Sequence, residues 1–361
     1  MRLVGENGFR RWRTSVLLTG ALLGSLLPRT MAAAEPPVIA LDVIGGLAGV
    51  SQYDRYEAPF WTTVVPAITG GRVAPRIAPF DRTGLRGQEL LQLLRLGVVS
   101  FANVILSIAA GDEPELNALD LPLLSPDAAG MRRVVTLWRP RLEETLLERH
   151  GVTVLAVYSH PAQVVFCNRA FAGLSDLTGR RVRTSSVGQS ELLTALGAIP
   201  VVVPFAEMVS AMRSGVVECA VTGALSGNAI GLGSVATHQS RFGLGWGVSA
   251  FVANTDAWNA LPEEVRRVLG EGLRDLEDRI WEAAASDTEQ GLACNAGRPN
   301  CVSGQPGRMA VVELRREDEE RRRSLLTEVI LPNWIRRCGG TCAEAWNRLM
   351  APSLGLRARG S

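Results

Sequence analysis

The chain contains no lysine, so all 38 of its basic residues are arginine. This absence excludes two chemistries that need a lysine amine, namely Schiff-base catalysis and the phosphate-binding loop of nucleotide hydrolases. Histidine is also scarce, and His150, His160 and His238 are too widely separated to suggest a metal site or a catalytic triad. The hydrolase motifs Gly-x-Ser-x-Gly and His-Glu-x-x-His are missing as well. We therefore expect a protein that is not an enzyme, that needs no cofactor or metal, and whose histidines are structural or at the surface.

The sequence also lacks a large net charge of one sign. Its formal net charge is +2, but the first 34 residues hold five arginines and one glutamate, so the remainder carries −2. A nearly neutral body has no positive field to attract a nucleic acid, and we expect no such partner. The 361 residues, of which 47% are hydrophobic and 20% charged, are ordinary for a globular protein and numerous enough for two lobes.

Residues 1–34 have the three parts of a secretory signal peptide. Arginines near the N-terminus form a basic start, Val16–Leu27 is an apolar core of 12 residues, and Ala32–Ala34 is a small-residue cleavage site. A core of this length is too short to span a bilayer comfortably, so we favour cleavage near Glu35 over an uncleaved membrane anchor. The mature protein is then expected in the periplasm.

Short strand-like and helix-like runs alternate between residues 176 and 223. The strand-like runs are Arg181–Ser185, Ile199–Val203 and Val216–Val221, and the helix-like runs are Gln189–Leu196 and Phe205–Arg213. This alternation predicts an α/β fold with a parallel sheet, in which ligands bind beyond the carboxyl ends of the strands. Arg183 lies near the end of one such run.

A similar alternation occurs earlier in the chain. The remaining strand-like runs are Val38–Val43, Gly71–Pro79, Val98–Leu106, Val152–Ser159, Val164–Cys167 and Gly245–Asn254. The first three predict another β-α-β arrangement, the next two cross to a second lobe, and the last returns to the first. Gln52, Tyr53 and Trp61 are candidates for lining a cleft, with a core or surface position as the alternative.

Four motifs occur in a fixed order in the central region. They are Asp-Leu-x-Gly-x-x-x-Arg at 176–183, Ala-Leu-Gly-Ala-x-Pro at 195–200, Pro-Phe-x-Glu at 204–207 and Gly-Val-Val-Glu at 215–218. In this order and spacing, the chain resembles the substrate-binding proteins of tripartite ATP-independent periplasmic (TRAP) transporters, over nearly all of its mature length. The resemblance implies a two-lobed α/β clamp, like other periplasmic binding proteins, which closes on its ligand by a hinge motion.

The resemblance also implies ligand-binding roles for particular residues. In this family, the arginine that corresponds to Arg183 binds the carboxylate of an organic acid. The strand pattern by itself is also compatible with a solvated arginine at the surface. Gln163 replaces a second arginine that some relatives carry, including binders of sialic acid, which argues against sialic acid as the ligand. Thr222 stands where those relatives place a ligand-contacting asparagine.

For three further candidate ligand-binding residues, a purely structural role is the alternative. Phe205 shares a helix face with Val209 and Met212, which favours core packing. Glu207 lies in the first turn of that helix, where a carboxylate interacts favourably with the helix dipole, or else it ties pocket residues together. Trp246 begins the return strand and either caps the cleft or packs in the core.

A long helical pattern follows. Over residues 262–290 apolar residues repeat at three- and four-residue spacing, and Pro262 with Glu263 and Glu264 marks the start. Such a helix is long enough to brace both lobes, as the resemblance also implies. A helix over 127–150, interrupted by Pro140, and a charged helical run over 313–323 are expected as well.

The lobes are assigned from these elements. We predict lobe 1 at residues 35–155 with parts of 246–361, lobe 2 at 156–245, and the lobe-spanning helix at 262–290.

The expected secretion of the chain determines how its cysteines are interpreted. Cys294 with Cys301, and Cys338 with Cys342, predict two small-loop disulfides in an oxidising compartment. A four-cysteine zinc site is the alternative, although neither pair has the usual two-residue spacing. Cys167 and Cys219 lie in apolar strands and are expected as buried thiols.

Together these features predict an extracytoplasmic solute-binding protein. It would act as a monomer, capture a small organic acid between its lobes and deliver it to a TRAP-type membrane permease. A ligand-binding module of a sensor and, less favoured, a secreted hydrolase are the alternatives.

Overall fold

The computed structural model describes residues 37–313 and 315–359. Its strands are β1 (Ile39–Gly45), β2 (Val73–Pro79), β3 (Phe101–Ile105), β4 (Val152–Cys167), β5 (Arg181–Thr184), β6 (Ile199–Val202), β7 (Cys219–Gly223), β8 (His238–Ser240), β9 (Gly245–Asn254) and β10 (Ala310–Val312). Its α-helices are α1 (Val65–Ile68), α2 (Leu90–Arg95), α3 (Leu106–Ala109), α4 (Ala128–His150), α5 (Val187–Ala195), α6 (Met208–Arg213), α7 (Ala224–Ala229), α8 (Thr255–Asn259), α9 (Glu263–Asn295), α10 (Arg316–Leu325), α11 (Leu331–Cys338), α12 (Gly340–Leu349) and α13 (Ala351–Leu354).

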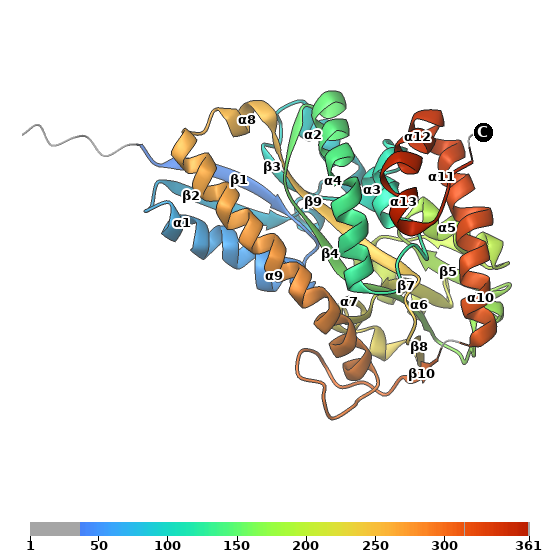
Figure 1. The fold of residues 1–361 in the computed structure, drawn as a ribbon. Helices are drawn as coiled ribbons and strands as arrows, with labels where there is room; N and C mark the ends of the chain where they lie inside the picture. The colour runs from blue at the N-terminus through green and yellow to red at the C-terminus, as the bar shows by residue number, and fades with distance from the viewer. Residues whose placement is uncertain (1–36, 314, 360–361) are drawn as a thin grey trace, which may run out of the picture. The chain divides into compact units, whose positions relative to one another are not determined.

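The strands form one mixed sheet with two parallel groups. Their order is β2-β1-β3-β9-β4-β7-β5-β6, with β8 beside the end of β4 and β10 beside β8 (Figure 1). In the first lobe β1 is parallel to β2 and β3, and in the second lobe β5 is parallel to β6 and β7. The fold is thus the predicted two-lobed α/β arrangement, while the residue boundaries given above for the lobes stay a prediction.

Two long antiparallel strands join the lobes. The sequence pattern predicts two strands within 152–167, but the structure has a single strand of 16 residues, β4, which pairs with β9 along most of its length. Their register shifts at two places, between Val154 and Ala156 and between Ser159 and Ala162. Pro161 lies in the second interval and has no N–H to donate to the ladder.

The predicted long helix is present as α9. It has 33 residues and so extends for about 50 Å at about 1.5 Å per residue. Its buried stripe includes Val265, Leu269, Leu273, Leu276 and Ile280. The helix contacts α1 in the first lobe, α7 in the second, and β4 between them (Figure 1). It therefore spans both lobes, as predicted.

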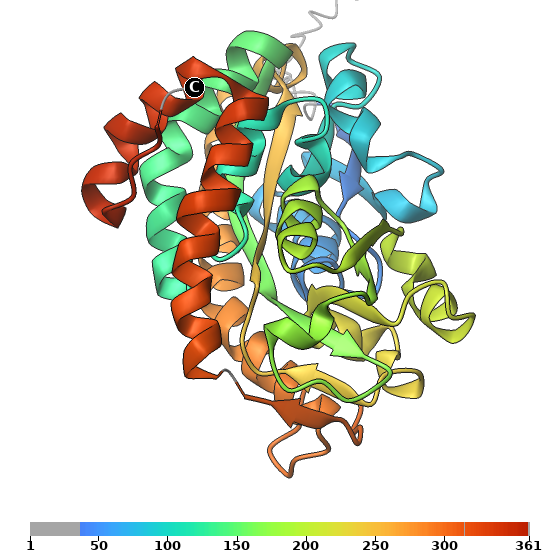
Figure 2. The same cartoon turned by 90° about the vertical axis from the view of Figure 1, so that its right-hand side faces the viewer.

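The other helices cover the sheet together with the C-terminal segment. The C-terminal helices lie beside α4 (Figure 2). Trp138 of α4, Trp334 of α11 and Trp346 of α12 form a buried cluster there, with ring centroids 5.5–6.4 Å apart. The interruption expected at Pro140 is wrong, because α4 continues through it with Trp138 and Leu142 buried on either side. Of the charged run predicted to be helical over 313–323, the part from Arg316 onward is helical, in α10.

The segment between β1 and β2 is helical over most of residues 52–68, which the sequence pattern does not predict. Gln52, Tyr53 and Trp61 are buried here. The Trp61 ring stacks on Phe251 of β9 with centroids 5.3 Å apart. The core alternative therefore holds for these three residues.

All six cysteines form disulfides. Cys294–Cys301 and Cys338–Cys342 are paired as predicted. The expectation of free thiols at Cys167 and Cys219 is wrong, because these two residues also form a disulfide. They lie directly opposite each other on the antiparallel strands β4 and β7, with Cα atoms 4.1 Å apart. This separation resembles that of a non-hydrogen-bonded antiparallel pair, whose side chains are closest.

Candidate ligand-binding site

A cavity of about 460 Å³ lies where the two lobes face each other. The first lobe contributes residues that follow the ends of β1, β2 and β3, and the second contributes residues from β5, β7 and the segment after β6. The joining strands β4 and β9 contribute His160, Gln163 and Gly247 to the lining. The carboxyl ends of the parallel strands thus converge on one space, as expected for a ligand site in an α/β sheet.

Arg183 is a buried cation in this lining. It lies on β5 between Val201 of β6 and Ala220 of β7, and only 3% of its surface is exposed. Its Nε donates a hydrogen bond to the Val203 carbonyl at 2.9 Å, and its Nη1 donates to the Val221 carbonyl at 2.8 Å. These two bonds fix the plane of the guanidinium.

The charge of Arg183 has no acidic partner among residues 37–313 and 315–359, and its Nη2 has no hydrogen-bond acceptor there. Burial lowers the pKa of Arg183 to about 10, which still leaves it charged at neutral pH. A buried charge is expensive unless an opposite charge compensates it. The arrangement therefore suits an anion that enters the cavity.

Four other sequence candidates also line the cavity. Gln163 of β4 is half-buried and its Nε2 donates to the Pro161 carbonyl at 3.3 Å. Thr222 of β7 is buried and lies opposite Val164. Phe205 and Glu207 belong to a short helical turn before α6, where Phe205 packs partly on the second-lobe core and Glu207 is exposed. The structure thus brings Arg183, Gln163, Thr222, Phe205 and Glu207 to one space.

Trp246 is placed differently. It is buried, it does not line the cavity, and its indole Nε1 donates to the Ser125 carbonyl at 3.3 Å. This position corresponds to the core alternative.

The wall that the first lobe contributes was not predicted from the sequence. Six apolar side chains form most of it: Leu47, Val50, Phe80, Leu85, Ile105 and Ile108. Leu47, Phe80 and Ile105 follow or end parallel strands, where ligands bind in such sheets, and this position is the sequence signal for the wall.

His160 was also missed as a cavity residue. It is 7% exposed, and its Nε2 lies 2.9 Å from the Ser249 hydroxyl. Burial lowers its pKa to about 4, so it is neutral near pH 7.

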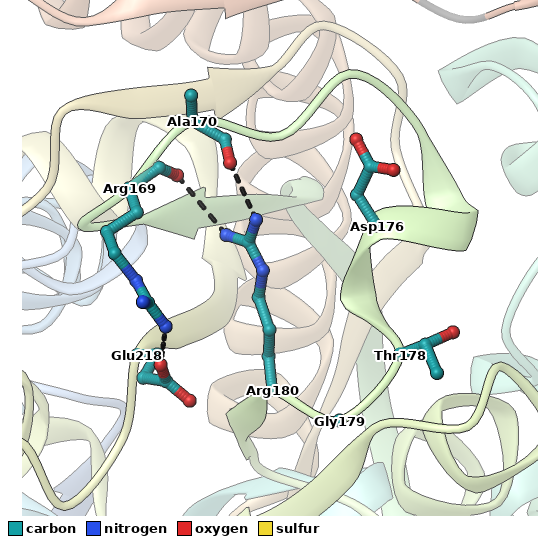
Figure 3. A pocket seen from close by; sticks show the side chains of 7 residues that line it. All are labelled: Arg169, Ala170, Asp176, Thr178, Gly179, Arg180 and Glu218. Carbon is teal, nitrogen blue, oxygen red and sulfur yellow. Dashed lines mark hydrogen bonds and ion pairs between the residues drawn. The ribbon is translucent and has the colours of Figure 1, made fainter.

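A second hollow is an open depression on the surface of the second lobe (Figure 3). The Asp176–Gly179 turn lies at its edge, and Arg169, Arg180 and Glu218 line it. The two Arg180 Nη atoms donate to the carbonyls of Arg169 and Ala170 at 3.3 and 2.6 Å. Arg169 is paired with Glu218. These groups bind one another and hold the chain that leads into β5.

Comparison with known proteins identifies the family. The family model for the bacterial extracellular solute-binding proteins, family 7, matches residues 50–296. The chain belongs to this family. Family 7 comprises the TRAP substrate-binding proteins that the sequence motifs indicate.

Relatives and solved structures agree with this membership. The chain is 25% identical over 278 residues to the C4-dicarboxylate-binding periplasmic protein DctP of Rhodobacter capsulatus, an alignment that covers 76% of this chain and 82% of the relative. A Bordetella pertussis extracytoplasmic solute receptor that binds pyroglutamic acid has a TM-score of 0.77 at 20% identity, covering 86% of this chain and 99% of the receptor. A TRAP solute-binding protein of Rhodoferax ferrireducens with bound malonate has a TM-score of 0.74 at 19% identity, covering 87% and 98%.

Family membership places this TRAP solute-binding protein outside the cytoplasm. The predicted signal peptide at residues 1–34 lies outside the described residues. Within 37–313 and 315–359, no helix combines the length and the apolar character needed to cross a bilayer.

Proposed function

We propose that the cavity binds the carboxylate of a small organic acid at Arg183, and that the protein hands this acid unchanged to a TRAP membrane permease. The observation that carries the proposal is the buried Arg183 guanidinium, which faces the cavity without an acidic partner among the described residues. A guanidinium has parallel N–H donors that match the two oxygens of a carboxylate. The ligand would supply the missing negative charge.

Neighbouring residues would orient the acid. Gln163 and Thr222 lie on adjacent strands close to β5, and both have polar atoms suited to hydrogen bonds with the rest of the ligand. Phe205 offers an apolar ring two residues after Val203, whose carbonyl fixes Arg183. We assign Glu207 a secondary role at the rim because it is exposed and lies in the first turn of a helix.

The ligands named for the relatives support an acid as ligand. C4-dicarboxylates, pyroglutamic acid and malonate all carry at least one carboxylate. The family serves in transport, which supports release of the acid without chemical change.

The lobes would close around the bound acid. Only the strands β4 and β9 join the two parallel groups of the sheet in the described residues. One of their two register shifts, between Ser159 and Ala162, includes His160 of the cavity lining. Hinges are commonly a few residues that absorb a change in backbone angles. We expect a ligand-dependent decrease in the radius of gyration, measured by small-angle scattering.

Native mass spectrometry of the purified protein tests the proposal. Wild-type protein should retain a small acid whose mass is unchanged after prolonged incubation, while the Arg183→Ala variant should lose it. Arg76→Ala is the matched control, because Arg76 is exposed and pairs with Asp42 on the neighbouring strand at 2.9 Å. Retention of the same acid by Arg183→Ala would overturn the assignment, and conversion of the acid to another mass would overturn the transport-only role.

A further inference from the structure

The charged side chains that line the cavity differ in burial and in whether they already have a partner of opposite charge. Four charged side chains line it, namely Arg183, Arg86, Asp81 and Glu207. Arg86 is exposed, and its Nε already donates to Glu89 at 2.9 Å. Arg183 is therefore the one lining cation that is both buried and without an acidic partner in the described part of the chain.

The wall contributed by the first lobe is unsuited to a second anion. It consists mainly of the six apolar side chains named above. Its charged members are Asp81, which accepts the Ala48 N–H at 3.0 Å, and the exposed Arg86, which is already paired with Glu89. A second carboxylate that reached this wall would lose its hydration without gaining an unpaired cation. It would also meet the negative charge of Asp81.

His160 does not supply the missing cation. Its Nε2 is engaged with the Ser249 hydroxyl, and its burial keeps the imidazole neutral near pH 7. The buried or half-buried amide and hydroxyl groups of the lining, such as those of Gln163 and Thr222, are uncharged near pH 7.

We infer that the cavity selects a monocarboxylic acid with an uncharged and largely apolar body over a dicarboxylic acid. This inference rests on the proposed binding of a carboxylate at Arg183. It sets the chain apart from the Rhodobacter capsulatus relative, whose name specifies C4-dicarboxylates. An apolar body would bury its surface against the first-lobe wall, while its single carboxylate would pair with Arg183.

Matched pairs of acids test the inference by calorimetry. Protein is first dialysed until native mass spectrometry finds it free of ligand, and then titrated with hexanoate against adipate and with 4-methylbenzoate against terephthalate. Each pair keeps a similar body and adds a second carboxylate at the far end. We expect the monocarboxylate to bind at least about tenfold more tightly in each pair, which corresponds to about 1.4 kcal/mol. Arg183→Ala should remove the binding of both members.

A variant of the apolar wall sharpens the test. Leu85→Arg, in the loop after β2, adds a cation to this wall and should reduce or reverse the preference for hexanoate over adipate. Leu85→Met keeps the wall apolar and should retain the preference. If adipate or terephthalate binds as tightly as its partner and Arg183→Ala abolishes that binding, the inference is overturned while the proposed function stands. If Arg183→Ala binds the acids like the wild type, or if none of the four acids binds at millimolar concentration, the proposed carboxylate site fails together with the inference.

Discussion

The surface depression of the second lobe and the cavity between the lobes contain arginines that are close in sequence but differ in environment. In the surface depression Arg169 and Arg180 are satisfied by Glu218 and by backbone carbonyls (Figure 3). In the cavity Arg183 has two carbonyl acceptors but no acid among the described residues. Sequence proximity therefore does not distinguish a structural arginine from a ligand-binding one, whereas burial and the identity of the partner do.

The pKa values of the two hollows shift for different reasons. In the cavity, burial alone lowers the pKa of both Arg183 and His160, which disfavours their charged forms. In the depression, the backbone N–H of Arg181 is the main group that lowers the pKa of Glu218, and Arg169 and Arg181 add to it. That shift favours the charged form of Glu218. The cavity therefore contains a buried positive charge without a negative partner among the described residues. The depression already contains the negative charge that compensates its arginines.

The comparison is tested most strongly at Arg183. Arg183→Ala should weaken ligand binding by about 3–5 kcal/mol, because it removes one partner of a buried ion pair and strands the other. This is a loss of roughly 10²–10³-fold or more in affinity, measurable by calorimetry with the acid that co-purifies. Arg183→Lys should also bind much more weakly, since an ammonium lacks the parallel donors.

Arg180→Ala is the matched control for this experiment. It removes an arginine three residues away that bonds only to carbonyls in the described structure, so the affinity should stay within about threefold of the wild type. Equal losses in the two variants, or none in Arg183→Ala, would contradict the distinction between the hollows.

The second prediction concerns the disulfide beneath the depression. Cys167 precedes Asn168 and Arg169, and Cys219 follows Glu218, so the Cys167–Cys219 bond joins the chain segments that carry this ion pair. It spans 52 residues of sequence, and its removal in a Cys167→Ala, Cys219→Ala variant should lower the free energy of unfolding by about 4 kcal/mol on the loop-entropy model. Denaturant unfolding measures this loss. Ligand affinity should hardly change, because neither cysteine lines the cavity.

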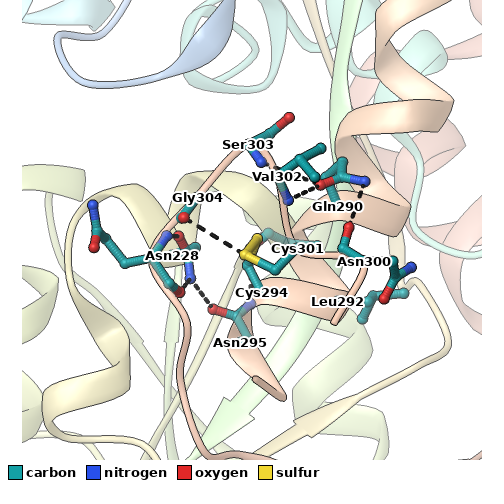
Figure 4. Close-up of a disulfide and its surroundings, with 12 residues drawn as sticks. Asn228, Gln290, Leu292, Cys294, Asn295, Asn300, Cys301, Val302, Ser303 and Gly304 are labelled. Atoms are coloured by element: carbon teal, nitrogen blue, oxygen red, sulfur yellow. Dashed lines mark hydrogen bonds between the residues drawn. A yellow bond between two sulfur atoms is a disulfide. The ribbon is translucent and has the colours of Figure 1, made fainter. Parts of the chain in front are cut away.

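The Cys294–Cys301 disulfide is the control for loop length. It closes a separation of only seven residues at the end of α9, where Gln290 also accepts the backbone N–H groups of Val302 and Ser303 (Figure 4). Removing this disulfide should lower the free energy of unfolding by a smaller amount, about 2–3 kcal/mol. A larger loss from this pair than from Cys167–Cys219 would refute the loop-entropy argument.

The sequence was sufficient to predict the strands and helices whose hydrophobic periodicity agrees with their burial in the fold. The strands around Arg183, the return strand β9 and the long helix α9 all have strong periodicity, and their predicted bounds differ from the structure by a few residues. The cysteine pairs of 294–301 and 338–342 were predictable because their members are neighbours in sequence.

The failures at the Cys167–Cys219 pair and at the cavity wall share one physical cause, which is that long-range register cannot be derived from local pattern. Cys167 and Cys219 became partners only when β4 and β7 were aligned. The apolar wall of the cavity likewise comes from three strand ends that converge only in the fold. For Trp246 the sequence left two alternatives, and only its contact with the distant Ser125 separates a core position from the cleft.

The third prediction uses the titration of His160 in ligand-free protein. Its pKa is about 4 when folded and about 6.5 in an unfolded chain, so between these values the unfolded state binds the additional proton. The free energy of unfolding should therefore fall by at most about 3 kcal/mol as the pH decreases from about 6.5 to about 4. The contribution of His160 should not change further below about pH 4. His160→Gln keeps a hydrogen-bonding side chain but cannot titrate. Identical slopes for wild type and variant over this pH range, in chemical unfolding, would exclude the shift.

The smallest effect is expected at Glu218 in the depression. Its lowered pKa in the folded state means that the ionised carboxylate stabilises the fold, so the contribution is present above the unfolded pKa and disappears as the pH falls through the folded pKa. Because Arg169 is exposed, the coupling in a double-mutant cycle of Arg169→Ala and Glu218→Gln should be below about 1 kcal/mol at pH 7. The coupling should disappear once the pH falls below the folded-state pKa of Glu218, and ligand affinity at pH 7 should be the same in all members of the cycle. A coupling that persists when Glu218 is protonated would show that this pair acts through packing, and an altered affinity would show that the two hollows are not independent.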